Sequence, residues 1–229
     1  MIMKKILLFY VFVALLASCK VDTYPLPSET LTGRLITADG QPLLTEQPNG
    51  FRIQLKEIVN GQPSYSPQYF WGKADGSFNN SKIFAGEYII QPVEGAFLDV
   101  DPVQVDIKGG RTEINFEVVP FLTIMADIST SGPDLIVRYR IQKAPGAGKI
   151  MTARLLVSKW NPNVGMNRVD YETTRDLSQT DDGTIVITTY QDKIQDVFEN
   201  GVTYYIRVAA LAANTSGRYN FSEVTCLEM

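Results

Sequence analysis

Three pairs of neighbouring carboxylates are the first residues of this chain that could do chemistry. They are Asp99 with Asp101, Asp170 with Glu172, and Asp181 with Asp182. Hydrolysis of a glycosidic bond needs two carboxyl groups about 5 to 10 Å apart. Side chains two residues apart on a strand point to the same side, so the first two pairs could reach such a spacing. Acids on the loops and edges of small β-domains are more often solvated, and we expect no catalytic residue among them.

Other catalytic and metal-binding patterns fail on residue type. The chain has no histidine, which excludes Ser-His-Asp and Cys-His nucleophiles and every histidine-ligated metal site. Residues 144–149 look like a phosphate-binding loop, but Lys143 and Ile150 occupy the positions of the required glycine and Ser/Thr, so a hairpin turn is expected. Asp181-Asp182-Gly183 could collect calcium, yet it lacks the spaced oxygen ligands of an EF-hand, and a plain turn is favoured. The sequence therefore predicts no enzyme, no metal and no cofactor.

Aromatic side chains are the stronger candidates for binding. One segment contains Tyr65, Tyr69, Phe70 and Trp71, and a second has Trp160 before the polar turn Asn161-Pro162-Asn163, with Tyr171 shortly after. Sugars stack their apolar C–H faces on flat rings, while amide and charged side chains bond their hydroxyls. Aromatic residues of β-sandwiches more often lie in the core, which is the alternative for each residue. We take Trp71 and Trp160, flanked by Tyr69 and Tyr171, as candidate glycan-binding residues.

The N-terminus holds a cysteine in a setting typical of lipidation. Lys4 and Lys5 precede an apolar run over residues 6–16, which is about half the length of a membrane-spanning helix. Leu16-Ala17-Ser18-Cys19 follows and resembles the bacterial lipobox. The resemblance implies that residues 1–18 are a signal peptide and that acylated Cys19 anchors the protein in a lipid bilayer. An ordinary secretory signal with an incidental cysteine is the alternative.

Composition agrees with a folded module outside the cytoplasm. Removal of the leader would leave 19 basic residues against 25 acidic ones, so the formal net charge would go from −4 to −6. No basic run is present, and nucleic acid is not an expected partner. With Cys19 lipidated, Cys226 would be the only thiol and no internal disulfide could form. We expect Cys226 to be a small buried residue of the last strand.

The elements that must position these residues are short strands. Residues 19–30, with Pro25 and Pro27, are expected to form a tether. From residue 31 to about residue 120, strand-like runs at 31–37, 51–59, 69–73 and 103–107 alternate with turn residues. The turns contain Asp39-Gly40, Asn60-Gly61, Asp75-Gly76 and Gly109-Gly110. Such pairs supply the positive φ that tight hairpins require.

Three motifs in this part carry a family resemblance. They are Gly33-Arg34-Leu35-Ile36 with Asp39-Gly40-Gln41-Pro42, then Asp75-Gly76-Ser77-Phe78, then Ala85-Gly86-Glu87-Tyr88-Ile89-Ile90. Together they resemble the carboxypeptidase regulatory-like or transthyretin-like β-sandwich. The resemblance implies a binding or spacer domain over residues 31–120 that has no enzyme activity of its own.

A second sandwich is expected over residues 121–229. The run 201–210, with Gly217-Arg218-Tyr219 and Ser222-Glu223-Val224, resembles strands F and G of a fibronectin type III domain. Tyr204, Ile206, Val208 and Ala210 fall on one face, and Tyr204 could be a tyrosine corner. Weaker strand predictions are 122–128, 135–143, 150–160, 169–175 and 184–190, with one helical turn over 192–198. The predicted fold class is all-β, two consecutive antiparallel β-sandwiches after a lipoprotein signal peptide.

The order lipobox, tether, regulatory-like sandwich and fibronectin-like sandwich resembles an uncharacterised family of Bacteroidetes outer-membrane lipoproteins, typically encoded beside SusC/SusD-type glycan-uptake transporters. The resemblance implies an accessory protein on the outer membrane, facing the cell surface. Surface export in that family favours acidic residues after the cysteine, and this chain has Lys20-Val21-Asp22, so a periplasmic orientation stays open. Two functions follow: a non-catalytic polysaccharide-binding accessory, or a scaffold that packs against a SusC/SusD-type transporter or a partner lipoprotein.

Overall fold

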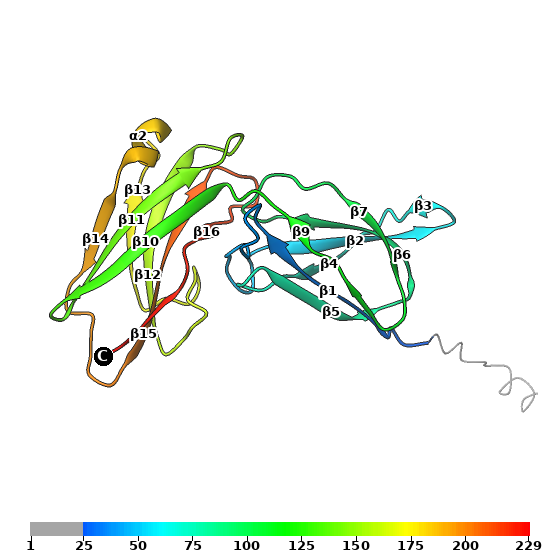
Figure 1. Cartoon of the computed structure of the whole chain (residues 1–229), viewed down its shortest axis with the longest axis horizontal. Coiled ribbons are helices and arrows are strands. Elements are labelled where there is room, and N and C mark those ends of the chain that lie inside the picture. The colour runs from blue at the N-terminus through cyan, green and yellow to red at the C-terminus, as the bar shows by residue number, and fades with distance from the viewer. Residues whose placement is uncertain (1–24) are drawn as a thin grey trace, which may run out of the picture.

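A computed structural model describes residues 25–229 of the chain. The predicted signal peptide and Cys19 lie outside the described residues. Within them the chain is almost entirely β-structure, arranged as two layered lobes that follow one another along the sequence (Figure 1). The all-β, sandwich-type fold class is therefore confirmed. No helix in residues 25–229 has the length and apolar character needed to cross a membrane.

Two sheets face each other in the first lobe. One contains β1 (Glu29–Ile36), β5 (Ser77–Ile83), β8 (Arg111–Glu113) and β9 (Phe116–Glu117). The other contains β2 (Arg52–Val59), β3 (Gln62–Pro63), β4 (Gln68–Trp71), β6 (Gly86–Val93) and β7 (Val103–Ile107). The β2–β3 turn has positive φ at both Asn60 and Gly61, as the Asn-Gly pair predicts.

The period-two pattern of these strands separates the core from the surface. Ile53 and Leu55 of β2 are buried in the lobe's core, and Phe70 of β4 packs against the same cluster beside Phe78. Neighbouring positions on the same strands face outward, among them Tyr69 and Trp71. The prediction that Phe70 and the Tyr69–Trp71 pair lie on opposite faces is confirmed.

The second lobe also has two sheets. The strand order of one sheet is β10 (Leu122–Ser131), β11 (Asp134–Lys143), β14 (Tyr190–Ile194). The strand order of the other is β13 (Tyr171–Asp176), β12 (Ile150–Lys159), β15 (Thr203–Ala212), β16 (Asn220–Phe221), and β17 (Thr225–Glu228) also pairs with β15. Tyr204, Ile206, Val208 and Ala210 are buried together, as predicted. The Tyr204 hydroxyl accepts a hydrogen bond from the Glu199 backbone N–H at 2.9 Å, which is the contact expected of a tyrosine corner.

Two predictions for the segment before β15 are wrong. Residues 184–190 are not a strand, because α2 (Asp182–Ile187) occupies most of them, and the Asp181 carboxylate caps it by accepting the Thr184 N–H. Residues 192–198 are not a helical turn, because β14 pairs with β11 there. Asp192 of β14 points inward and is buried. Because an acidic residue takes an inward position, the sequence lacks the apolar alternation that would predict a strand here.

Asp192 tolerates burial because polar partners surround it. The Tyr139 hydroxyl donates to the Asp192 carboxylate at 2.9 Å, and Arg175 of the facing sheet forms an ion pair with the same carboxylate. Burial, reinforced by the negative charge of Asp192, raises the pKa of the Tyr139 hydroxyl. This buried polar group therefore ties the two sheets of the second lobe together.

Two smaller predictions are also corrected. Cys226 is exposed on β17 instead of buried, because β17 lies against only one end of β15 and alternation turns the thiol outward. Residues 144–149 do form a turn, closed by the Ala147 N–H donating to the Ala144 carbonyl at 3.1 Å, but the turn is no hairpin. It joins β11 to β12, which belong to different sheets.

Buried polar side chains join the two lobes. Arg207 of β15 is only 2% exposed, and its guanidinium donates to the carbonyls of Thr45 in the first lobe (3.0 Å) and of Val164 (3.4 Å) and Ser222 (3.0 Å) in the second. The same group lies 4.1 Å above the Phe221 ring. Burial lowers the pKa of Arg207 to about 9, so it still carries its charge at neutral pH.

A buried amide makes the second connection. The Asn220 side chain donates to the Ala96 carbonyl of the first lobe at 2.8 Å and accepts the Leu122 N–H at 2.9 Å. The Glu46 carboxylate of the first lobe accepts the Met166 N–H of the second at 3.0 Å. These directional contacts fix the position of one lobe against the other, and with it the surface that both contribute to at their junction.

Candidate functional site

The outer face of the β4–β2–β6 sheet carries the first set of candidate residues. Tyr69 and Trp71 are 41% and 39% exposed, and the β2–β4 ladder places Gln54 opposite Tyr69 and Arg52 opposite Trp71. The Gln54 amide donates to the Tyr69 hydroxyl at 2.8 Å. The Arg52 guanidinium lies 4.4 Å from the centre of the Tyr69 ring and 5.4 Å from that of Trp71. The two aromatic rings are therefore held in place by polar neighbours on the next strand.

β6 extends this surface toward the second lobe. Gln91 lies opposite Gln54, and its amide donates to the Val100 carbonyl at 2.8 Å. Glu94, directly after β6, forms an ion pair with Arg52. Glu94 has φ of 57°, a left-handed conformation that is uncommon for a residue other than glycine. After this bend the chain reaches Ala96, whose carbonyl accepts the hydrogen bond from Asn220 of the second lobe. The polar surface therefore ends where the two lobes meet.

The second lobe contributes a short loop after β15. The Arg218 guanidinium lies 5.2 Å from the centre of the Trp71 ring. Asn214 fixes the loop, because its side chain donates to the carbonyls of Ala212 (2.7 Å) and Arg218 (3.1 Å) and accepts from the Arg218 N–H (3.1 Å). Trp71 is thus approached by guanidinium groups from both lobes. The loop needs no rearrangement to present Arg218 there.

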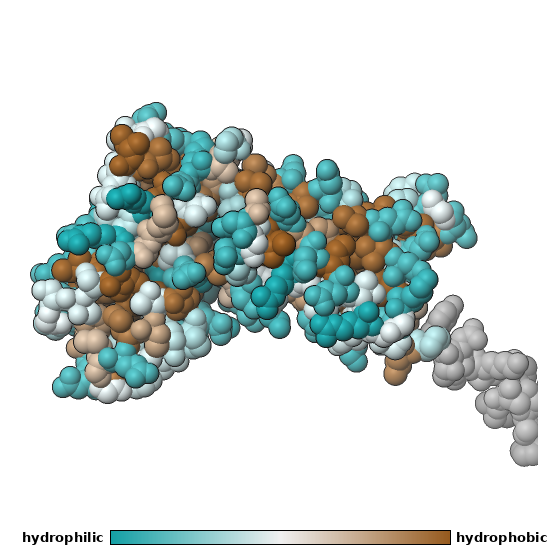
Figure 2. All heavy atoms as spheres, viewed as in Figure 1, coloured by the Kyte–Doolittle hydropathy of each residue, from teal (hydrophilic) through white to brown (hydrophobic). Residues whose placement is uncertain are grey.

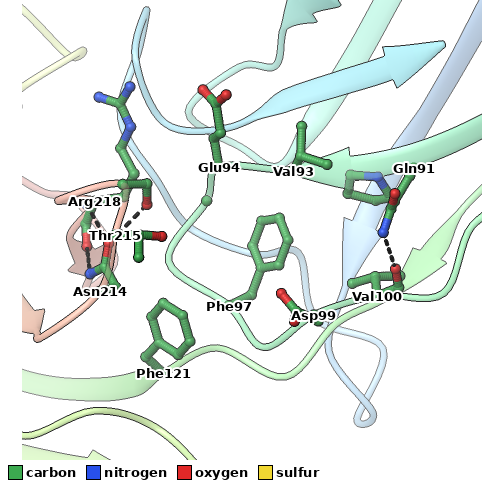
Figure 3. A pocket seen from close by; sticks show the side chains of 13 residues that line it. Gln91, Val93, Glu94, Phe97, Asp99, Val100, Phe121, Asn214, Thr215 and Arg218 are labelled. Carbon is green, nitrogen blue, oxygen red and sulfur yellow. Dashed lines mark hydrogen bonds between the residues drawn. The ribbon is translucent and has the colours of Figure 1, made fainter. Parts of the chain in front are cut away.

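A hollow of about 450 Å³ lies where the end of β6 and the segment after it meet this loop. Figure 3 shows the Phe97 and Phe121 rings at its base, the Asp99 carboxylate on one side, and Thr215 and Arg218 on the other. Its size falls in the range of small-molecule sites. Because aromatic, amide, carboxylate and guanidinium groups line one concave surface, the arrangement suits a ligand with both apolar faces and many hydroxyl groups. We refer to Arg52, Gln54, Tyr69 and Trp71 with this hollow as the junction site.

The structure separates the four aromatic residues predicted from the sequence. Trp160 follows β12 and donates its backbone N–H to Thr203, at the start of β15, whereas the Arg218 loop follows the end of β15. The ten residues of β15 span about 30 Å, so Trp160 lies far from the junction site. Trp160 is 61% exposed with φ of 63°, and Tyr171 is half-buried beneath Lys159. Trp71 and Tyr69 are brought together; Trp160 and Tyr171 stay at the other end of the second lobe.

Most of the paired carboxylates have structural partners. The Asp170 carboxylate accepts the Lys159 N–H at 2.6 Å, and Glu172 forms an ion pair with Arg154. Asp182 bonds Lys143 at 2.6 Å and the Ile150 N–H at 3.0 Å. Burial by itself would raise the pKa of Asp182, but these bonds outweigh it and the pKa is lowered. No group of three or more metal-ligating side chains occurs within residues 25–229.

Sequence reasoning missed the polar half of the junction site. The outward positions of Arg52 and Gln54 follow from alternation along β2, so the strand pattern held a signal for them. Nothing in the sequence indicates that Arg218 meets Trp71, since the two are nearly 150 residues apart and belong to different lobes.

The fold and the site define an all-β protein of two sandwich lobes with an aromatic and polar surface at their junction. Residues 29–119, which make up the first lobe, match the family model described as "Protein of unknown function (DUF3823) N-terminal domain". A comparison with curated proteins finds no match.

Solved structures of similar fold cover both lobes. A DUF3823 family protein from Bacteroides uniformis is 21% identical with a TM-score of 0.76, over 89% of this chain and 100% of that one. A DUF3823 family protein from Parabacteroides merdae is 23% identical with a TM-score of 0.72, over the same shares. A third structure, from Bacteroides uniformis, is called a "putative carbohydrate binding protein"; it is 19% identical with a TM-score of 0.73, again over 89% and 100%. At these identities the likeness establishes the fold.

Proposed function

We propose that this protein is a non-catalytic, glycan-binding accessory lipoprotein of a polysaccharide-uptake system. The observation that carries the proposal is the junction site, where the exposed rings of Tyr69 and Trp71 lie beside Arg52, Gln54 and a concave hollow. Flat apolar rings next to amide and charged groups match the alternating C–H faces and hydroxyls of sugars. One structure of similar fold carries a carbohydrate-binding name, which agrees with the proposal.

Binding without turnover fits the state of the acidic residues. A glycosidase needs one carboxylic acid with a raised pKa to protonate the leaving oxygen. Glu94 and Asp99 are the acids that line the hollow; Glu94 is held in an ion pair with Arg52, and Asp99 is exposed. Neither carboxyl group is enclosed in an apolar pocket of the kind that houses the general acid of a glycosidase.

The proposal places the protein on the outer membrane, anchored through acylated Cys19 and facing the cell surface. The lipobox-like Leu16-Ala17-Ser18-Cys19 supports the anchor. Nine residues separate Cys19 from β1, and they span at most about 35 Å when fully extended. Such a tether would keep the first lobe near the bilayer and the junction site farther out.

The test uses the lipid-free protein, residues 20–229, on a panel of soluble polysaccharides in affinity electrophoresis. We expect retardation by at least one polysaccharide, and we expect Trp71→Ala to weaken it about tenfold or more, the equivalent of about 1.4 kcal/mol. Trp160→Ala is the matched control, because it removes an equally large exposed ring far from the junction site. Migration unaffected by every polysaccharide would contradict the glycan-binding function, and equal losses in both variants would contradict the placement of the site.

A second candidate role, packing against a transporter or a partner lipoprotein, is favoured by a different surface. A hollow of about 700 Å³ on another side of the junction is lined by Pro42, Leu44, Val119 and Met125, and both Val119 and Met125 are nearly half exposed. β10 borders it and pairs only with β11 among the described strands, so one of its edges is open to another strand. We expect Met125→Glu to reduce recovery of outer-membrane partners during co-purification from detergent, and unchanged recovery would contradict this role.

A further inference from the structure

The guanidinium of Arg218 in the junction site has no counter-ion among the described residues. Among residues 25–229 its guanidinium forms no ion pair and donates no hydrogen bond, and its Nε atom is buried. Arg52, whose guanidinium also lies near the Trp71 ring, is neutralised by Glu94. Since a guanidinium normally bonds acceptors through its N–H groups, the terminal N–H groups of Arg218 are positioned to bond an acceptor that arrives with the ligand.

The remaining walls of the hollow define what else that ligand carries. Phe97 and Phe121 give the base an apolar surface, and Thr215 adds a hydroxyl on the side of the hollow from which Arg218 extends (Figure 3). Asp99 lies across from Arg218, is exposed, and has no hydrogen bond or ion pair of its own among the described residues. The hollow therefore presents a cation on one side and a hydrogen-bond acceptor on the other, about an apolar base.

We propose that the junction site recognises an acidic polysaccharide, with the carboxylate of a uronic acid residue on Arg218 and the ring hydroxyls of that residue on Asp99 and Thr215. The planar guanidinium matches a carboxylate in a two-bond geometry. Because Arg52 and Glu94 cancel each other, Arg218 supplies the positive charge for the carboxylate, while the negative charge of Asp99 lies across the hollow. This inference rests on the proposed glycan-binding function and names the class of sugar.

The test compares three probes on the lipid-free protein: polygalacturonate, its fully methyl-esterified form, and dextran sulfate. We expect polygalacturonate to bind at least tenfold more tightly than the ester, which keeps the rings and hydroxyls but loses the charge. We also expect its affinity to fall with added salt, because ionic contacts are screened. Binding of dextran sulfate equal to or tighter than that of polygalacturonate would overturn the assignment to a carboxylate.

Substitutions at Arg218 test whether this residue produces the preference for the acidic polysaccharide. Arg218→Gln should abolish both the preference for polygalacturonate over its ester and the salt dependence, while Arg218→Lys should retain part of each. Arg138→Gln, an exposed arginine on β11, is the control for loss of one positive charge. A preference unchanged in Arg218→Gln would overturn the role of Arg218. Tight binding of neutral polysaccharides with no preference for the acid would overturn the inference and leave the proposed function standing, whereas the absence of any glycan binding would overturn both.

Discussion

Replacement of Arg207 by methionine is the perturbation whose size the structure allows us to work out most directly. Methionine keeps much of the aliphatic volume but removes every donor. The carbonyls of Thr45, Val164 and Ser222 would then be buried at the junction without these bonds, and each unsatisfied group costs about 1 kcal/mol. Two further effects oppose each other: the desolvation of the guanidinium is relieved, and buried Glu46 loses its nearby positive charge. We therefore expect Arg207→Met to lower the free energy of unfolding by about 3 kcal/mol.

The chain offers a direct way to measure this loss in each lobe. It has two tryptophans, Trp71 in the first lobe and Trp160 in the second, so Trp160→Phe and Trp71→Phe each leave a reporter in one lobe. In urea, the two single-tryptophan proteins should unfold at one common midpoint while the junction is intact. In the Arg207→Met background we expect lower and separate midpoints, since Arg207 bonds both lobes.

An exposed arginine provides the control for this substitution. Arg138→Met, which removes an exposed arginine of the second lobe, should change the free energy of unfolding by no more than about 0.5 kcal/mol. If Arg207→Met also cost less than about 1 kcal/mol and the two midpoints still coincided, the buried guanidinium would not be what couples the lobes.

Three further predictions concern the junction and the second lobe. Asn220→Ala removes a buried amide that bonds both lobes, and it should lower the free energy of unfolding in urea by about 2 to 3 kcal/mol. A smaller loss would indicate that water replaces the amide. Tyr204→Phe deletes one hydroxyl and should cost about 1 kcal/mol with faster amide exchange at Glu199; unchanged exchange there would contradict the tyrosine-corner contact. The pKa of Asp182 in the folded state is lowered from 3.8, so its contribution to stability is present above that pH and is lost as the pH falls through the lowered value. Lys143→Met should shrink this acid-dependent loss of stability in thermal melts. An identical pH profile in the variant would count against the ion pair.

Local patterns predicted much of each lobe correctly. Alternation along β4 placed Tyr69 and Trp71 outward and Phe70 inward, and the Asn60-Gly61 pair marked the β2–β3 turn. The failures occurred where a polar contact from a distant strand replaced the expected apolar one. Asp192 of β14 is buried only because Arg175 and Tyr139 meet it, and no window of sequence around Asp192 contains either.

One exposed apolar side chain of the second lobe belongs to the short helix α2. Figure 2 shows apolar atoms at the tip that α2 occupies in Figure 1, and α2 ends at Ile187, whose side chain is 82% exposed. The helix buries Ile185 and leaves Ile187 outward, because a six-residue helix can press only one face onto the lobe.

The sequence by itself determined the all-β class, the alternation of its strands and the two aromatic candidates of the first lobe, because backbone geometry fixes a period of two within each strand. Only the tertiary structure decided which candidates lie together. The packing of one lobe on the other brought Arg218 to Trp71 and formed the hollow between them, while the length of β15 kept Trp160 away. Contacts between residues nearly 150 positions apart depend on how whole sheets dock, and no local pattern encodes that arrangement.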